Sequence, residues 1–151
     1  MLISHTMNVF GERQHNEKYI PTVINTILKG DTLLIHSDPT KTIPGSRCWI
    51  HARTVAAAVL FMLQTTTTRD KINIVGKELN NLEIAKHISQ VMGLPLKYEL
   101  VDFHSSRPGH DLRYALSGVK LKKLGFKPEY NLKDSLAKTV KWLLLHNKWL
   151  G

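Results

Sequence analysis

A strand followed by a helix is encoded in residues 71–93, which read KINIVGKELNNLEIAKHISQVMG. Residues 71–75 alternate between polar and apolar side chains, as a half-buried strand does, and Gly76 ends the run. Asn80 or Asn81 can then cap a helix, because an asparagine side chain accepts a hydrogen bond from the free N–H groups of the first turn. One face of this helix would carry the apolar residues Leu82, Ala85, Ile88 and Met92.

Strand and helix candidates alternate on both sides of this unit. Further strands are expected at residues 2–8, 32–36, 47–51 and 96–101. Further helices are expected at about residues 20–29, 54–64, 117–124 and 132–144, with Thr54 as one cap and residues 9–11 as a loop. This alternation predicts an α/β fold, and 151 residues suit one domain with a real core.

Composition places the chain among globular proteins, with 42% hydrophobic and 22% charged residues. Cys48 is the only cysteine, which excludes an intramolecular disulfide and suits a reducing compartment. The histidines show no metal-ligand spacing, so no metal is expected. Residues 1–10 do not read as a signal peptide, and the longest apolar run, residues 55–63, is too short to span a bilayer. A cytoplasmic protein without membrane contact is the expectation.

The net charge of +9 is concentrated in the second part of the chain. Residues 104–151 carry 10 Lys and Arg against 3 Asp and Glu. Such a segment could attract nucleic acid or another anion. We favour a solvated helical surface, because the lysines at 133, 138, 141 and 148 are spread out and no ladder of aromatic residues accompanies them.

Several motifs of nucleotide-dependent enzymes are absent from the sequence. No two of the nine glycines lie two positions apart, so there is no G-x-G-x-x-G loop to hold a pyrophosphate. No G-K-[ST] phosphate loop occurs, and no tyrosine has a lysine four residues later. The chain therefore lacks the Tyr-x-x-x-Lys pair with which short-chain dehydrogenases transfer a proton.

Three segments could nevertheless hold an anionic ligand. Residues 107–111, Arg-Pro-Gly-His-Asp, combine an arginine fork that can grip a phosphate with a tight turn that leaves room for it. Arg47 precedes Trp49 in an extended segment, and Asn8 stands at the end of a strand and precedes a glycine loop. Each segment also has a purely structural interpretation. In the first, Arg107 or Arg113 would pair with Asp111. In the second, Trp49 would lie in the core while Arg47 reaches solvent, and in the third, Asn8 would cap a turn.

Taken together and in this order, the segments resemble the extended short-chain dehydrogenase/reductase family, and within it the nucleotide-sugar 4,6-dehydratases of the dTDP-glucose 4,6-dehydratase type. Residues 8–21, NVFGERQHNEKYIP, resemble that family's Asn-x-Tyr-Gly-Pro-x-Gln-x-x-Glu-Lys-x-Ile-Pro. Residues 107–114, RPGHDLRY, resemble its Arg-Pro-Gly-His-Asp-x-Arg-Tyr loop, and residues 138–142, KTVKW, its Lys-Thr-Val-x-Trp. Residues 72–76, INIVG, stand where the family has Tyr-Asn-Ile-Gly.

The resemblance covers only the carboxy-terminal half of that family. It implies one substrate-binding domain over residues 1–151, in which residues 2–8 are a remnant Rossmann strand and no complete Rossmann domain exists. In the family, the amino-terminal half binds NAD and carries the catalytic Tyr, Lys and Asp-Glu pair. No cofactor and no catalytic residue is therefore expected in this chain.

The resemblance also implies a substrate site and marks where this chain departs from the pattern. The residues expected to contact the diphosphate and sugar are Asn8, Lys18, Arg47, Arg107 and His110. Tyr19 and His36 are expected to line the pocket for the base. Phe10 replaces the usual Tyr, Glu12 the usual Pro, and Arg53-Thr54 stands where many members have an acidic pair. These departures bear on which base and sugar are bound.

The expected function is that of a truncated or split nucleotide-sugar 4,6-dehydratase that binds a dTDP- or UDP-sugar but does not catalyse alone. In the complete enzyme NAD would oxidise the sugar at C4, water would leave across C5–C6, and the hydride would return to C6. A separate chain could supply the NAD-binding domain, and the free edge of the strand at residues 2–8 could also favour a homo-oligomer. Alternatives are a standalone sugar-nucleotide-binding or regulatory module, an epimerase fragment and, least favoured, a nucleic-acid binder.

Overall fold

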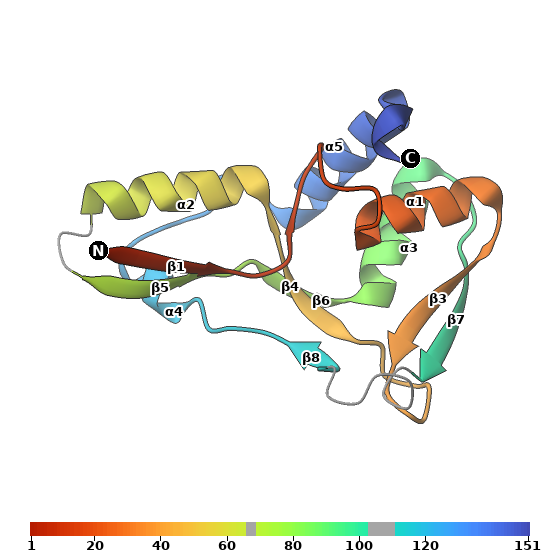
Figure 1. Ribbon diagram of the computed structural model, residues 1–151, viewed down its shortest axis with the longest axis horizontal. Coiled ribbons are helices and arrows are strands. Elements are labelled where there is room, and N and C mark those ends of the chain that lie inside the picture. Colours follow the sequence, from red (N-terminus) through yellow and green to blue (C-terminus); the bar gives the residue numbers. More distant parts are fainter. Residues whose placement is uncertain (66–68, 103–110) are drawn as a thin grey trace.

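The computed structural model of the protein describes residues 1–65, 69–102 and 111–151 (Figure 1). Strands and helices alternate along the chain, as the sequence predicts. In order they are β1 Leu2–Thr6, β2 Val9–Phe10, α1 Tyr19–Lys29, β3 Thr32–Ser37, β4 Ser46–His51, α2 Ala52–Thr65, β5 Asp70–Ile74, β6 Lys77–Asn80, α3 Asn81–Met92, β7 Lys97–Asp102, β8 Arg113–Tyr114, α4 Val119–Lys123, α5 Leu132–Leu145 and the 3-10 turn η1 Asn147–Trp149.

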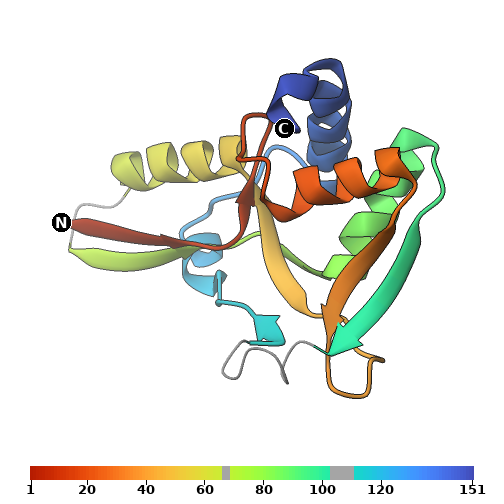
Figure 2. The same cartoon turned by 45° about the vertical axis from the view of Figure 1, so that its right-hand side comes forward.

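The described residues form three small sheets, and most of the strand pairs in them are parallel. β1 pairs with β5 from Leu2↔Asp70 to Thr6↔Ile74, and β3 pairs with β7 in the same parallel sense. β4 is the centre of the third sheet, where it pairs in parallel with β2 and β8 and antiparallel with β6. In Figures 1 and 2, β4 and β6 lie between the β1–β5 pair and the β3–β7 pair.

The helix ends follow the local signals in the sequence. Gly30 and Gly93 adopt the left-handed backbone that glycine tolerates, and so they end α1 and α3. Asn80 caps α3, because its side chain accepts from the Glu83 N–H while the Glu83 carboxylate accepts from the Asn80 N–H, both at 2.8 Å. Ile20, Ile24 and Ile27 are buried on the inward face of α1, whereas Leu28 is 51% exposed.

Two clusters of apolar side chains form the core. The larger lies between α1, β3, α3 and α5, and the smaller between α2, β5 and α4. The smaller cluster contains Ala58 and Met62 of α2, which pack with Ile72 and Ile74 of β5. None of the helices within the described ranges has the length and apolarity needed to cross a membrane.

Three local expectations need correction. Val9–Phe10 is a short strand rather than part of a loop, because it pairs with Ile50 and His51 of β4. β6 has no counterpart among the expected elements, since its residues alternate too weakly to signal a strand. α2 begins before Thr54, because the His51 ring nitrogen Nδ1 accepts from the Arg53 N–H at 3.1 Å and so caps the helix.

Candidate functional site

Arg47 lies in β4 and directs its guanidinium at three backbone carbonyls. Nη1 donates to the oxygens of Ser46, at 2.7 Å, and Leu112, at 3.1 Å, and Nη2 donates to that of Asp111, at 3.0 Å. The side chain is half-buried, and burial lowers the pKa of Arg47, while the Asp111 carboxylate and Tyr114 oppose that shift. A guanidinium starts from such a high pKa that it stays charged, so these carbonyls position a permanent cation.

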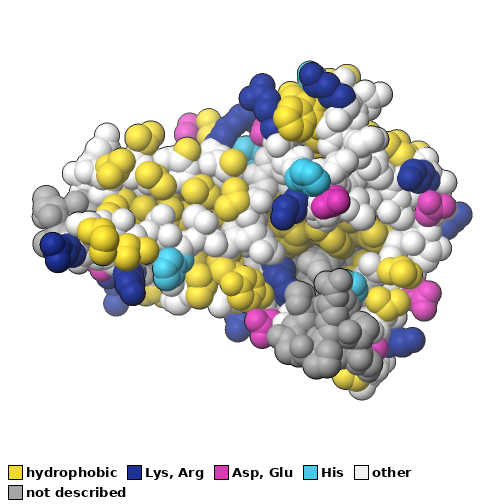
Figure 3. Space-filling view, viewed as in Figure 1, with side chains coloured by type: hydrophobic (Ala, Val, Ile, Leu, Met, Phe, Trp, Pro, Cys, Tyr) yellow, Lys and Arg dark blue, Asp and Glu magenta, His cyan; other side chains and the backbone are white. Residues whose placement is uncertain are grey.

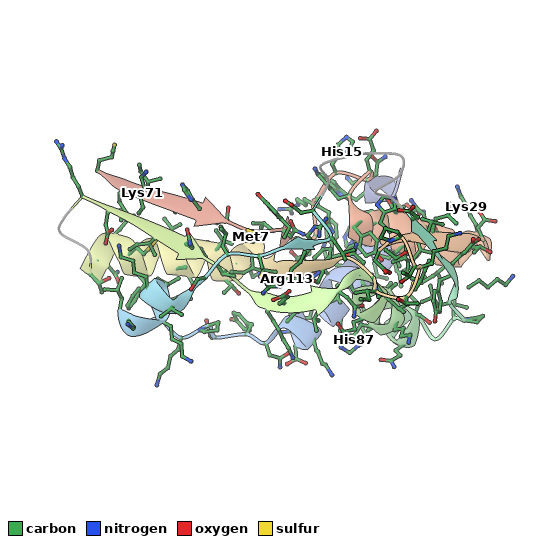
Figure 4. The ribbon with its side chains drawn as sticks, turned by 90° about the horizontal axis from the view of Figure 1, so that it is seen from below. Met7, His15, Lys29, Lys71, His87 and Arg113 are labelled. Carbon is green, nitrogen blue, oxygen red and sulfur yellow. The ribbon has the colours of Figure 1, made fainter. Side chains whose placement is uncertain are left out.

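The charge of Arg47 is not met by a contacting carboxylate anywhere in the described part of the chain. Arg113 of β8, labelled in Figure 4, differs because it donates to both carboxylate oxygens of Glu78 in β6, at 2.7 and 2.8 Å. The bonds from Arg113, together with one from the Ser46 hydroxyl, lower the pKa of Glu78, and the Glu78 carboxylate raises the pKa of Arg113. Arg113 thus pairs with Glu78 rather than Asp111, and Arg47 keeps charge available for an anion.

The backbone around Gly45 joins Arg47 to two other residues that the resemblance implies. The Gly45 N–H donates to the His36 carbonyl at 2.9 Å, and the Gly45 carbonyl accepts from the Asn81 N–H at 2.9 Å. The Tyr19 hydroxyl donates to the Asn81 carbonyl at 2.8 Å. We call Tyr19, His36, Gly45, Arg47 and Asn81 the Gly45 junction. Tyr19, His36 and Arg47 come from α1, β3 and β4, so this junction depends on tertiary structure.

Tyr19 and Trp49 hold the elements of the Gly45 junction together. Their ring centroids lie 5.7 Å apart, and Trp49 Nε1 donates to the Leu79 carbonyl at 3.2 Å. Trp49 is only 6% exposed, so its structural interpretation as a core residue is right. Burial raises the pKa of Tyr19, which keeps its hydroxyl protonated and able to donate. The pair fixes α1 against β4 and the start of α3.

Asn81 is a site candidate that sequence reasoning missed. Its side-chain oxygen Oδ1 is buried and has no hydrogen-bond partner among the described residues. A buried acceptor without a donor is costly, so such an atom marks a place where a ligand or water can donate. The sequence shows two adjacent asparagines before the helix, of which Asn80 is the cap, but it does not show that the Asn81 side chain is buried without a partner.

The remaining predicted residues lie apart from the Gly45 junction or outside the described residues. Asn8 is half-buried after β1, and its carbonyl accepts from the Ile50 N–H at 3.4 Å. Lys18 is exposed directly before α1, next to Tyr19. No hydrogen bond found in the described ranges joins either side chain to the Gly45 junction. Arg107 and His110 fall in residues 103–110, which the structure does not describe.

An ordered turn connects His36 to Gly45. The Asp38 carboxylate accepts from the N–H groups of Thr42, at 2.9 Å, and Ile43, at 2.7 Å, and from the N–H and hydroxyl of Thr40. The hydroxyl of Thr40 contributes most, and together these bonds lower the pKa of Asp38 to about 2. The carboxylate is ionised at neutral pH and closes the turn between β3 and β4.

A second polar cluster joins β2, β4 and α2. Glu12 lies with one carboxylate oxygen 3.2 Å from His51 Nε2 and the other 3.0 Å from Arg53 Nη2. His51 is buried against Phe10, whose ring meets it edge-on with centroids 5.2 Å apart. Burial lowers the pKa of His51 despite the opposing carboxylate. Sequence reasoning named these residues singly and did not predict the cluster.

A cavity of about 820 Å³ lies between β4, the β5–β6 turn and residues 116–135. None of Asn8, Lys18, Tyr19, His36 and Arg47 lines it. Its walls are mainly apolar, as Ile50, Val75 and Phe126 illustrate, which does not suit a diphosphate. The chemistry for an anion is at Arg47, so we place the candidate site at the Gly45 junction. No group of three or more His, Cys, Asp or Glu suited to a metal occurs among the described residues.

Comparison with known proteins gives consistent matches. The model of the NAD dependent epimerase/dehydratase family matches residues 1–75. The low-salt glycan biosynthesis protein Agl12 of Haloferax volcanii is 36% identical over 144 residues, which cover 95% of this chain and 44% of that protein. The dTDP-glucose 4,6-dehydratase of Haemophilus influenzae is 32% identical over 158 residues, covering 97% of this chain and 46% of the enzyme.

Solved structures give the same result for the fold. The dTDP-glucose 4,6-dehydratase of Bacillus anthracis, in complex with NAD, aligns with a TM-score of 0.80 and 27% identity over 98% of this chain and 46% of its own. Epimerases in complex with UDP-sugars also match. Residues 1–75 thus match the NAD dependent epimerase/dehydratase family, and the chain resembles dTDP-glucose 4,6-dehydratases over nearly its whole length, with the α/β fold of the extended short-chain dehydrogenases. The resemblance seen in the sequence is thereby confirmed, and the chain spans about 45% of these relatives' length.

Proposed function

We propose that this chain is the sugar-nucleotide-binding part of a nucleotide-sugar 4,6-dehydratase that acts on a dTDP- or UDP-glucose-type substrate. One observation carries the proposal: Arg47 is held by three carbonyls, is half-buried, and meets no carboxylate among the described residues. A guanidinium that is held in place and is not neutralised by a carboxylate is well suited to bind a diphosphate. The family assignment makes a nucleotide diphosphate sugar the fitting anion.

The other residues extend the site around this cation. Asp111 and Leu112 both bond Arg47 through their carbonyls, so the described end of the 107–111 segment lies at Arg47. Arg107 and His110, just before it in sequence, are proposed as further contacts to the diphosphate and sugar. Asn81 offers its free side-chain oxygen to an N–H or O–H of the ligand.

The remaining side chains of the proposed site lie on the side of α1 and β3. Tyr19 and His36 belong to the Gly45 junction and are proposed to border the base. Asn8, after β1, and the exposed Lys18, before α1, are proposed to contact the diphosphate sugar. All of these are substrate-binding roles, and none requires a proton transfer by this chain.

Catalysis is proposed to require NAD bound by residues that this chain does not contain. The sequence has neither the glycine-rich loop nor the Tyr-x-x-x-Lys pair, and the matched dehydratase structure from Bacillus anthracis holds NAD. When bound, NAD would supply reversible hydride transfer at the sugar. We therefore propose that the chain alone binds sugar nucleotide in the cytoplasm but neither binds NAD nor turns substrate over.

A related epimerase is the second candidate, because solved epimerases with UDP-sugars share this fold. Epimerases and dehydratases would use the same diphosphate contacts, so Arg47 would act identically in both. The two differ in the product of the complete enzyme, which chromatography of the reaction separates: a 4-keto-6-deoxy sugar for the dehydratase and an inverted sugar for the epimerase.

Isothermal titration with dTDP-glucose and UDP-glucose tests the proposed site. Replacing Arg47 by Ala should weaken binding by roughly 10- to 100-fold, because a charged hydrogen bond contributes about 1.5–3 kcal/mol. The matched control is Arg53→Ala, which removes an equally cationic, 63% exposed side chain that pairs with Glu12. The proposal would be refuted if Arg47→Ala bound sugar nucleotide as tightly as wild type. It would also be refuted if the wild-type chain bound neither sugar nucleotide at millimolar concentration but bound DNA.

A further inference from the structure

The cavity of about 820 Å³ beside β4 takes no part in the proposed function. We call it the α4 cavity, because α4 and the chain between α4 and α5 form one of its walls. In Figure 4, β1 lies on one side of β5 and α4 lies on the other. No residue of the Gly45 junction lines the α4 cavity. Its volume is within the range of about 300–1,000 Å³ that is usual for sites of small ligands, so it can hold a molecule of its own.

Apolar side chains line the α4 cavity from its inner wall to its rim. Ile50 of β4 and Ile74 of β5 are 4% and 0% exposed, whereas Leu116 and Val119 are 38% and 54% exposed. The cavity therefore reaches the surface of the protein. Apolar side chains that stay exposed around a hollow are typical of a binding site, because a ligand removes their surface from water.

Two nearly buried hydroxyl groups also belong to the lining of the α4 cavity. Thr54, in the first turn of α2, and Ser135 of α5 are 8% and 7% exposed. Neither hydroxyl has a hydrogen-bond partner among the described residues. A hydroxyl that is buried without a partner costs free energy, so both groups mark places where a polar atom of a ligand or a water molecule can bond.

Lysine side chains give the α4 cavity a positive rim. Lys77, Lys122 and Lys127 line it and are exposed, and none of them contacts a carboxylate in the described part of the chain. Among the described residues that line the cavity, only Glu78 is acidic, and Arg113 neutralises it. Lysine stems pack on apolar surface while their ammonium groups stay in water. The charge of this rim is complementary to an anion that has an apolar body.

We propose that the α4 cavity binds a small amphipathic anion, that is, an apolar ring system or chain that carries one anionic group. The apolar body lies along Ile50 and Ile74, and the anionic group reaches the ammonium groups of Lys122 and Lys127. This ligand differs from the sugar nucleotide of the proposed function, because the apolar walls do not suit a diphosphate. The α4 cavity is therefore a second binding site, separate from the Gly45 junction.

Another apolar surface of the chain competes for a ligand of this kind. Figure 3 shows hydrophobic side chains gathered over the end of the protein that carries β1 and α2. Leu60 and Leu63 of α2 are 61% and 66% exposed, and neither lines the α4 cavity. An open surface contacts a small molecule on one side only, whereas a cavity surrounds it, so we expect the tighter binding in the α4 cavity.

Fluorescence titration of the full chain with two related dyes tests the proposal. Anilinonaphthalene sulfonate has an apolar body and one anionic group, and phenylnaphthylamine has the same rings without the sulfonate. We expect saturable binding of one sulfonate dye per chain. Lys122→Gln with Lys127→Gln should weaken binding of the sulfonate dye roughly tenfold, because charged hydrogen bonds are lost, and should leave the affinity for the neutral dye unchanged.

The matched control is Lys123→Gln with Lys133→Gln, which removes two exposed lysines of α4 and α5 that do not line the cavity. It should leave the affinity for both dyes as in the wild type. Equal losses from the two double variants would show a general effect of net charge and would overturn the proposal. So would a wild-type chain that binds the sulfonate dye without saturation up to millimolar concentration.

Acidic substitutions on the two apolar surfaces locate the bound dye. Leu116→Glu with Val119→Glu should weaken binding of the sulfonate dye roughly tenfold or more, because two negative charges would face its anionic group at the rim. Leu60→Glu with Leu63→Glu should leave the affinity unchanged. The reverse result would place the dye on α2 and contradict the α4 cavity as the site.

Methyl NMR of the wild-type chain gives a readout that does not depend on any variant. The aromatic rings of the bound sulfonate dye should shift the methyl signals of Ile50 and Ile74, which lie in the inner wall. The methyl signals of Leu60 and Leu63 should stay in place at the same dye concentration. Shifts at Leu60 and Leu63 without shifts at Ile50 and Ile74 would refute the proposal.

Discussion

Two charged residues that depart from the family pattern compensate each other in space. Glu12 stands where the family has proline, and Arg53 where many members have an acid, and their side chains meet at 3.0 Å. Taken singly in the sequence, each looks like a change in the substrate site. Together they form an ion pair, and the Glu12 carboxylate also contacts the buried ring of His51.

At the residue scale, Asp38 is expected to make the stability of the protein sensitive to acid. Hydrogen bonds, that from the Thr40 hydroxyl first, lower its pKa to about 2, below its ordinary 3.8. Its contribution is therefore fully present above pH 4 and is lost as the pH falls towards 2. Asp38→Asn should lower the melting temperature at pH 7, because an amide nitrogen cannot accept the bonds made by the second oxygen.

Thermal unfolding between pH 7 and pH 2 is the measurement for Asp38. The wild type should lose more stability than Asp38→Asn between pH 4 and pH 2. Asp31→Asn, an exposed acid before β3, should retain the wild-type profile. The same acid dependence in Asp38→Asn and wild type would show that the carboxylate does not organise the turn.

At the element scale, the turn between β5 and β6 depends on a residue without a side chain. A Cβ on Gly76 would lie 1.8 Å from the carbonyl oxygen of Trp49, in the backbone of β4. Such an approach is sterically impossible, and a backbone atom cannot rotate away as a side chain can. Gly76 therefore lets β6 pair with β4 in its observed register.

Gly76→Ala is expected to separate β6 from β4 and to destabilise the fold strongly. The outcome should be a large fall in melting temperature or insoluble protein. Gly11→Ala is the matched control, because a Cβ there would meet its nearest neighbour at an ordinary 3.5 Å. Circular dichroism during heating compares the two, and a Gly76→Ala protein that melts like Gly11→Ala would contradict the close packing.

At the scale of the whole molecule, the two apolar clusters differ in how they are closed. Leu150 is 5% exposed and belongs to the larger cluster, and its carbonyl accepts from Asn25 Nδ2 at 2.5 Å. The end of the chain thus seals the core around α1 and α5. No residue of this tail is among the described members of the smaller cluster, which lies between α2, β5 and α4.

Leu150→Ala should therefore cost roughly 2–5 kcal/mol of unfolding free energy, as expected for a leucine removed from a packed core. Leu145→Ala changes a leucine that is 81% exposed and should cost less than about 0.5 kcal/mol. Urea denaturation at constant pH measures both. Similar midpoints for the two variants would mean that the tail does not close the core.

Much of the fold could be read from the sequence because its signals are local. Asn80, Gly30 and Gly93 act on their own helix ends, so their effects need no knowledge of distant residues. His51 as the cap of α2 and β6 as a partner of β4 were missed, because a histidine is an unusual cap and a short strand exists only through its neighbour. The motifs pointed to Arg47 for the site, but no pattern revealed the unpartnered oxygen of Asn81.

The sequence alone determined the α/β class, the ends of α1 and α3 at Gly30 and Gly93, and the family resemblance, because periodicity, capping and motif order are properties of consecutive residues. Tertiary structure decided which arginine side chains remain available to bind an anion. Arg113 is neutralised by Glu78 from another strand, whereas Arg47 donates to three backbone carbonyls and contacts no carboxylate among the described residues. Electrostatic pairing acts over a few ångströms of space, so residues 35 positions apart cancel each other while the unpaired arginine defines the candidate site.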